Sequence, residues 1–214
     1  MRVIVFGATG MVGQGVLREC LIAPDVTGVL VVTRTPTGVR HPRLREVTLA
    51  DFADLTPIEG ELTGYDACFY CLGVSSVGMD EAAYTRVSYD YPMAAAHALA
   101  RIDPEMTFVY VSGEGTDADS RLMWSRVKAR TEREVMELFR NGFAFRPGFI
   151  QPMHGVRSKT GWYNAVYTAI APLVPVLRRI APRYVTTTDA VGRAMLRAAR
   201  GGFESRVVTT ADMR

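Results

Sequence analysis

The sequence contains few of the residues that stabilise small secreted proteins. Its 214 residues include only three cysteines, Cys20, Cys68 and Cys71, which are too few for a disulfide framework. Met1 and Arg2 lead directly into the apolar residues 3–6, without the long apolar region and small-residue cleavage site of a secretory signal. The sequence therefore predicts a protein of the reducing cytoplasm.

Lysine is also scarce, since only Lys128 and Lys159 among the 25 basic residues are lysines. The net charge of +3 is spread among 22 acidic residues with no run of five like charges, which argues against a nucleic-acid-binding surface. Hydrophobic residues make up 48% and charged residues 22% of the chain, as in ordinary globular proteins. At about 150 residues per domain, the length predicts one domain with at most a short appendage.

One uncharged segment is long enough to raise the question of a membrane span. The 18 residues from Thr160 to Leu177 carry no charge, which meets the minimum length of a spanning helix. Prolines, an asparagine and hydroxyl residues interrupt the segment, and two arginines follow it directly. We expect a buried or interfacial helix rather than an integral span. A homodimer contact or a membrane-surface contact through this helix remains open.

Strand-like and helix-like segments alternate along most of the chain. Runs rich in β-branched and aromatic residues predict strands, and apolar residues at helical spacing predict helices between them. This alternation is typical of a parallel sheet with helices on both faces, so we predict an α/β, doubly wound fold. The expected strands are 2–6, 26–33, 45–49, 67–72, 107–112, 143–145 and one near Val207, and the expected helices are 11–23, 81–102, 121–139 and 189–200.

A glycine-rich turn joins the first expected strand to the first expected helix. Gly7, Gly10 and Gly13 follow a GxxGxxG spacing, in which the glycines allow a tight turn, close approach of a pyrophosphate, and close packing of the helix on the strand. The phosphates would face free N–H groups at the helix N-terminus. The position between a buried strand and a helix is the context that a dinucleotide-binding turn requires, although a plain strand–helix turn is the alternative.

The residue at the end of the second strand indicates which dinucleotide binds. An acid there would bind both ribose hydroxyls of NAD, whereas an arginine can bind the 2′-phosphate of NADP. The sequence reads Val32-Thr33-Arg34-Thr35, with no acid nearby. We therefore expect NADP, with NAD less favoured. A solvent-exposed arginine without a role is the alternative interpretation.

Together with later motifs, these residues resemble the atypical short-chain dehydrogenase/reductases, which include NmrA-like, epimerase-like and Tat-interacting-protein-like members. The further motifs are Asp51-Phe52, residues 66–73, residues 86–91 and Arg146-Pro147-Gly148. The resemblance implies one Rossmann-type domain, with a nucleotide-binding core over 1–150 and a small C-terminal helical substrate region over 151–214. The cofactor-binding residues expected from the turn and the resemblance are Gly7, Thr9, Gly10, Met11, Val12, Gly13, Arg34, Asp51, Phe52, Leu72, Gly73, Lys128, Pro147 and Gly148.

The segment that resembles the family's catalytic helix departs from the family pattern. The family has a tyrosine four residues before a lysine, on one helix face, whereas this chain has Trp124 before Lys128. An indole N–H cannot exchange a proton near neutral pH. The catalytic serine of the family aligns with Gly113, and a shift of one residue would restore Ser112. Lys128 and Ser112 are therefore the candidate catalytic residues.

Other chemically active side chains are weaker candidates. Cys68 and Cys71 form a CxxC, but residues three apart on a strand face opposite sides, so we expect neither a disulfide nor a metal pair, and no metal ion. Tyrosines at helical spacing usually pack or reach the surface, which makes a substitute acid among them less favoured, and the two histidines beside these segments are expected to be structural. These residues are Tyr84, Tyr89, Tyr91, His97 and His154.

Two functions of different classes follow from this pattern. The first is an NADP(H)-dependent oxidoreductase or epimerase-like enzyme that acts on a small carbonyl or alcohol. The second is a non-catalytic NADP(H) sensor that signals to a protein partner, suggested by Trp124 and Gly113 at the two catalytic positions. The sequence does not identify the substrate, because fold does not determine function.

Overall fold

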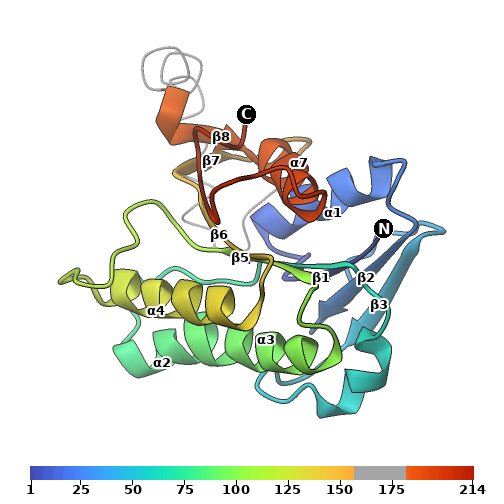
Figure 1. The fold of residues 1–214 in the computed structure, drawn as a ribbon, viewed down its shortest axis with the longest axis horizontal. Coiled ribbons are helices and arrows are strands. Elements are labelled where there is room, and N and C mark those ends of the chain that lie inside the picture. Colours follow the sequence, from blue (N-terminus) through green and yellow to red (C-terminus); the bar gives the residue numbers. More distant parts are fainter. Residues whose placement is uncertain (157–181) are drawn as a thin grey trace.

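The computed structural model describes residues 1–156 and 182–214, which form an α/β fold around a seven-stranded sheet (Figure 1). All neighbouring strands of this sheet are parallel. The strand order is β3-β2-β1-β4-β5-β6-β9, so the chain moves outward in opposite directions from the β1/β4 pair. The strands are β1 (Arg2–Phe6), β2 (Gly28–Thr33), β3 (Leu44–Thr48), β4 (Ala67–Tyr70), β5 (Thr107–Val111), β6 (Gly142–Arg146) and β9 (Val207–Thr209).

Helices cover both faces of the sheet. Figure 1 shows α1 and α7 on one side and α2, α3 and α4 on the other. Their bounds are α1 (Met11–Ile22), α2 (Glu81–Thr85), α3 (Tyr91–Ile102), α4 (Met123–Leu138) and α7 (Thr188–Ala199), and short 3₁₀ turns are η1 (Thr56–Leu62) and η4 (Pro182–Tyr184).

The sheet separates two apolar cores. Val3 and Val5 of β1 pack in the core that contains α1 and α7, whereas Ile4 and Phe6 pack in the core that contains α3 and α4. Strands that are buried on both faces have continuous apolar sequences, which is why these strands could be predicted. The predicted α/β doubly wound fold is confirmed, and most predicted element ends differ from the observed ones by one or two residues.

The expected helix over 81–102 contains a π-helical segment, η2 (Arg86–Asp90), between α2 and α3. Pro92 lacks an N–H and cannot donate to the carbonyl oxygen of Ser88, four residues earlier. That oxygen instead accepts hydrogen bonds from the hydroxyls of Tyr110 at 3.0 Å and Thr131 at 2.9 Å. A π turn that redirects a carbonyl therefore ties this helix to β5 and α4.

The C-terminal residues form the expected helix and the expected strand near Val207, and also a strand pair that the sequence did not indicate. A small parallel pair, β7 (Phe149–Gln151) and β8 (Val185–Thr187), leads into α7, and β9 extends the main sheet. Part of the region 151–214 therefore belongs to the central layers, and its role as a substrate region stays a prediction. The uncharged segment 160–177 lies outside the described residues. In the described ranges, no helix is long and apolar enough to cross a membrane.

Candidate functional site

The glycine turn leaves the N-terminus of α1 without a side-chain cap. Gly7 has φ +77°, and a Cβ there would lie 2.5 Å from the Leu72 backbone nitrogen. A Cβ at Gly13 would lie 2.1 Å from the Gly7 carbonyl oxygen, so α1 packs directly on the turn. Gly10 is the N-cap and offers no side-chain acceptor. The first N–H groups of α1 therefore point outward from the helix end, where an anion is favoured.

Residues on the β2 and β3 side of this turn lie in different environments. Arg34 is exposed just after β2. Asp51 is also exposed, where its carboxylate accepts from the Ala53 N–H at 3.0 Å and lies 3.4 Å from Arg86. Phe52 is only 3% exposed and packs in the core with Phe6. At this motif, Asp51 is therefore accessible to a ligand, whereas the Phe52 ring belongs to the core.

A cleft of about 460 Å³ lies beyond the carboxyl ends of β4, β5 and β6. It collects side chains and backbone from four separate parts of the chain. The expected residues Lys128, Pro147 and Gly148 line it, together with Trp124 and Gly113. The structure thus brings together the helix that carries Trp124 and Lys128 and the Arg-Pro-Gly turn, both of which the sequence indicated.

Lys128 is fixed at the end of β5. Its ammonium donates to the carbonyl oxygen of Ser112 at 2.9 Å and lies 3.4 Å from that of Val111. Burial lowers the pKa of Lys128 to about 8, and the negative charge of Glu132 opposes this shift. The lysine can therefore both hold and release a proton near neutral pH.

Ser112 has a different place from the one expected of a catalytic serine. Its side chain is buried, and its hydroxyl pairs with that of Thr116 at 3.0 Å. Gly113, the next residue, lines the cleft instead. The part of Ser112 that acts on the site is its backbone carbonyl, which holds Lys128. The two possible alignments of this strand end are thereby distinguished, because Gly113 occupies the cleft position.

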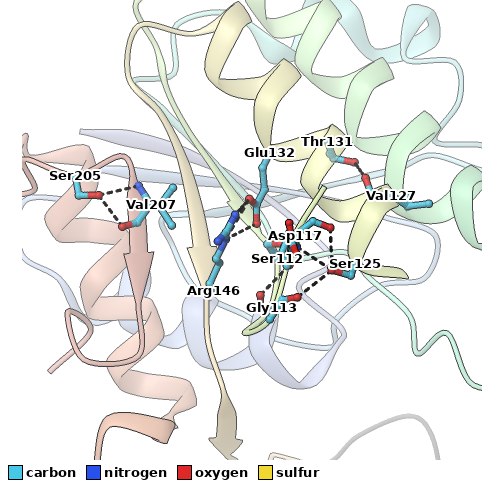
Figure 2. Close-up of polar contacts among 12 residues, drawn as sticks. Ser112, Gly113, Asp117, Ser125, Val127, Thr131, Glu132, Arg146, Ser205 and Val207 are labelled. Carbon is cyan, nitrogen blue, oxygen red and sulfur yellow. Dashed lines mark hydrogen bonds and ion pairs between the residues drawn. The ribbon is translucent and has the colours of Figure 1, made fainter. Parts of the chain in front are cut away.

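A buried ion pair lies one helical turn beyond Lys128 (Figure 2). Glu132 is 2% exposed, and its carboxylate accepts from Arg146 at 3.0 Å (Nε) and 2.5 Å (Nη2). These hydrogen bonds also raise the pKa of Arg146. Arg146 begins the Arg-Pro-Gly turn, so the pair joins α4 to the cleft wall. Sequence reasoning missed Glu132, although its position four residues after Lys128 places it on the same helix face.

The loop after β5 is held by hydrogen bonds, of which Figure 2 shows those that join Ser125 and Asp117. The Ser125 hydroxyl donates to the Gly115 carbonyl at 2.9 Å and accepts from the Asp117 N–H at 2.8 Å. The Glu114 N–H donates to the Pro147 carbonyl at 3.0 Å. Gly113 and Glu114 are therefore held between β6 and the start of α4, at the cleft wall.

The three tyrosines considered as substitute acids lie in different places in the structure. Tyr84 is buried and lines the cleft. Tyr89 donates to Glu134 at 2.6 Å on the outer side of α4, and Tyr91 accepts from Arg86 at 3.2 Å near Asp51. Only Tyr84 among these three is at the cleft.

The remaining sequence candidates lie elsewhere. Cys68 and Cys71 belong to opposite cores, and burial raises the pKa of both thiols. His97 is exposed on α3. His154 has a left-handed backbone (φ 54°), and its Nε2 lies 2.7 Å from the Asp189 carboxylate. None of these four side chains lines the cleft at the ends of β4–β6.

A second cavity, of about 490 Å³, lies on the other side of the glycine turn. Residues 34–43 join β2 to β3 without a helix, whereas parallel strands usually have a helical crossover. The flank of α1 is therefore left open, and Leu17, Arg18, Thr35 and His154 line the cavity together with Thr9 of the turn. The cavity lies between the glycine turn and the residues that follow Arg34.

Comparison with known proteins gives one family match. The model of the NAD dependent epimerase/dehydratase family matches residues 3–120, which include the glycine turn and the end of β5. FMP52-2, a mitochondrial protein of Scheffersomyces stipitis, is 29% identical over 151 residues, which cover 68% of this chain and 65% of that protein. Protein fmp52-1, mitochondrial, of Aspergillus terreus is 26% identical over 96% of this chain and 90% of its own.

Solved structures share the fold at low identity. A short-chain dehydrogenase/reductase family oxidoreductase from Burkholderia thailandensis has a TM-score of 0.74 at 16% identity, over 97% of this chain and 89% of that one. DesIV, a dTDP-glucose 4,6-dehydratase from Streptomyces venezuelae with NAD bound, has a TM-score of 0.72 at 17% identity, over 97% and 74%. These neighbours support the Rossmann-type fold.

The comparisons correct one expectation. The short apolar start and the few cysteines predicted a cytoplasmic location. The FMP52 relatives from several fungi are named mitochondrial proteins, which contradicts that prediction. The prediction was wrong because a reducing environment and a short apolar start do not distinguish the cytoplasm from the mitochondrion.

Proposed function

Because the chain belongs to the NAD-dependent epimerase/dehydratase family, we propose that it binds NADP(H) and transfers hydride between this dinucleotide and a small carbonyl or alcohol. One observation carries the proposal: a single edge of the sheet holds an uncapped glycine turn after β1 and a cleft with Lys128 after β5. In doubly wound sheets, this edge is where ligands bind.

The residues at this edge fit a dinucleotide. Met11, Val12 and Gly13 have no acceptor within their own helix for their N–H groups, which suit the phosphates. A Cβ at Gly73 or at Gly113 would meet no atom within 4 Å. The backbone between the turn and the cleft therefore leaves room for an extended ligand.

Arg34 supports NADP over NAD. Its guanidinium is exposed at the end of β2, and it makes no hydrogen bond or ion pair with the residues that the structure describes. A 2′-phosphate would give it a charge-assisted partner. The acids that NAD binding uses at this position are absent from residues 32–37.

Lys128 has the central role in the proposed chemistry. A bound nicotinamide would supply or accept the hydride. The Lys128 ammonium has three N–H donors, of which two serve the carbonyls of Val111 and Ser112, and the third suits a ribose hydroxyl. Since Trp124 cannot exchange a proton, we assign to Lys128 the proton that reaches the substrate oxygen, relayed through that ribose hydroxyl, when the hydride reaches the carbonyl carbon.

The test is NADPH oxidation by a panel of uncharged ketones and aldehydes. Lys128→Met should abolish oxidation, whereas Arg133→Met, a change on the exposed side of the same helix, should leave it unchanged. Oxidation that survives Lys128→Met at the wild-type rate would contradict the assignment.

A non-catalytic NADP(H) sensor is the second candidate, because Trp124 and Gly113 both line the cleft at the positions of the usual catalytic side chains. It predicts tight NADPH binding with no oxidation by any member of the panel. Trp124→Tyr should then introduce oxidation, since a tyrosine one turn before Lys128 restores the family arrangement. Turnover by the wild-type protein would exclude this function.

A further inference from the structure

Exposed apolar side chains lie at the mouth of the cleft, on either side of two serines, Ser75 and Ser76. Six large apolar side chains are well exposed in the described residues, and two of them, Val74 at 44% and Val77 at 72%, line this cleft. Trp124 and Pro147 also line it. Exposed apolar groups that gather at a concave site favour an apolar ligand.

Few charged side chains line the cleft, and they differ in whether they are already hydrogen-bonded to the protein. Among described residues, its charged lining groups are Lys128 and Glu114. Lys128 is tied to two backbone carbonyls. The Glu114 carboxylate is exposed and makes no hydrogen bond or ion pair with any described residue. A ligand at the mouth therefore meets an exposed negative charge, whose field also reaches Arg146, beside exposed apolar side chains.

We infer that this cleft takes an uncharged, apolar ketone or secondary alcohol with an aromatic or branched body, and that it disfavours anionic substrates such as nucleotide sugars. The inference rests on the proposed function in placing the reacting carbon beside Lys128. An apolar body buries Val74, Val77 and the Trp124 indole, and so removes apolar surface from water. A diphosphate there would lose water beside the Glu114 carboxylate, while Lys128, the cation among the described lining residues, is already hydrogen-bonded to two backbone carbonyls.

The experiment is calorimetric titration with two ketones of nearly the same shape. The neutral probe is 4-isopropylacetophenone and the anionic probe is 4-acetylbenzoate, with UDP-glucose as a nucleotide-sugar probe. Each is titrated into the protein alone and into protein with saturating NADP⁺, an oxidised form that cannot reduce a ketone. The two conditions test the inference whether or not the dinucleotide binds.

The neutral ketone should bind at least tenfold more tightly than 4-acetylbenzoate and UDP-glucose. Val77→Ser should weaken the neutral ketone about fivefold, whereas Leu122→Ser, a change at an exposed apolar residue that lines neither cavity, should not. Glu114→Gln should strengthen 4-acetylbenzoate about fivefold, and Asp119→Asn should leave it unchanged.

Equal or tighter binding of the anionic probes, or no effect of Val77→Ser and Glu114→Gln, would overturn the inference. Absence of binding by all three probes in both conditions would overturn it as well. If NADP⁺ fails to bind while the neutral ketone keeps its preference, the proposed function fails and the apolar site stands.

Discussion

The Glu132–Arg146 pair allows a sharp test of how the cleft is held. Glu132→Gln keeps the size of the side chain but removes the negative charge that faces Arg146 at 2.5–3.1 Å. Breaking a fully buried pair costs about 3–5 kcal/mol. Arg146 is 29% exposed and can be partly rehydrated, so we expect a loss of about 2–3 kcal/mol.

The loss should be visible as a lower midpoint of thermal unfolding. For a chain of this length, each 1 kcal/mol shifts the midpoint by about 2–4 °C, so the expected decrease is about 4–12 °C. The matched control is Glu137→Gln, which removes an exposed carboxylate of the same helix. Replacing both partners by apolar residues, Glu132→Leu with Arg146→Met, should recover much of the stability.

The same substitution should also act on Lys128. The charge of Glu132 raises the pKa of Lys128 against the effect of burial, so Glu132→Gln should lower that pKa further. The pH at which Lys128 loses its proton, followed through the pH dependence of NADPH oxidation, should shift downward. If Glu132→Gln matches Glu137→Gln in both unfolding and pH profile, the pair neither stabilises α4 nor tunes Lys128, and the reasoning fails.

Three further predictions concern the dinucleotide edge. Gly13→Ala places a Cβ 2.1 Å from the Gly7 oxygen and should abolish dinucleotide binding in calorimetry, whereas Gly60→Ala, where a Cβ meets open space, should not; equal binding would refute the turn assignment. Arg34→Ala should weaken NADPH about tenfold and NADH less than about twofold; equal losses in the two titrations would count against a 2′-phosphate contact. Ketone reduction should decline as pH rises through about 8, because Lys128 is charged below its pKa of about 8 and neutral above it; a rate that stays constant from pH 7 to 9 would remove Lys128 as the proton donor.

The fold was largely predictable because its signals are local. Strands buried on both faces appear in the sequence as uninterrupted apolar runs, and the glycine turn is identified from adjacent residues. The π segment at residues 86–90 was not predicted, since it depends on the distant hydroxyls of Tyr110 and Thr131. The β7–β8 pair was not predicted because each strand has only three residues, too few to give a clear pattern in the sequence.

Site residues were predictable where a sequence motif identifies them, and not where their role depends on contacts between distant parts of the chain. Lys128, Pro147 and Gly148 meet at one cleft as the resemblance implied. The burial of Phe52 depends on where strands end in space. The burial of the Ser112 hydroxyl was not predicted, because the sequence left the alignment of this strand end uncertain by one residue. The Glu132–Arg146 pair joins residues from a helix and a strand, and no spacing rule links them.

The most direct measurement is a calorimetric titration of the purified protein with NADPH and, separately, with NADH. The account predicts saturable NADPH binding with one site per chain, weaker NADH binding, and loss of both in Gly13→Ala. Comparable affinities for the two dinucleotides would contradict the role of Arg34. No binding of either at millimolar concentration would contradict the central claim that the edge after β1 and β5 is a dinucleotide site.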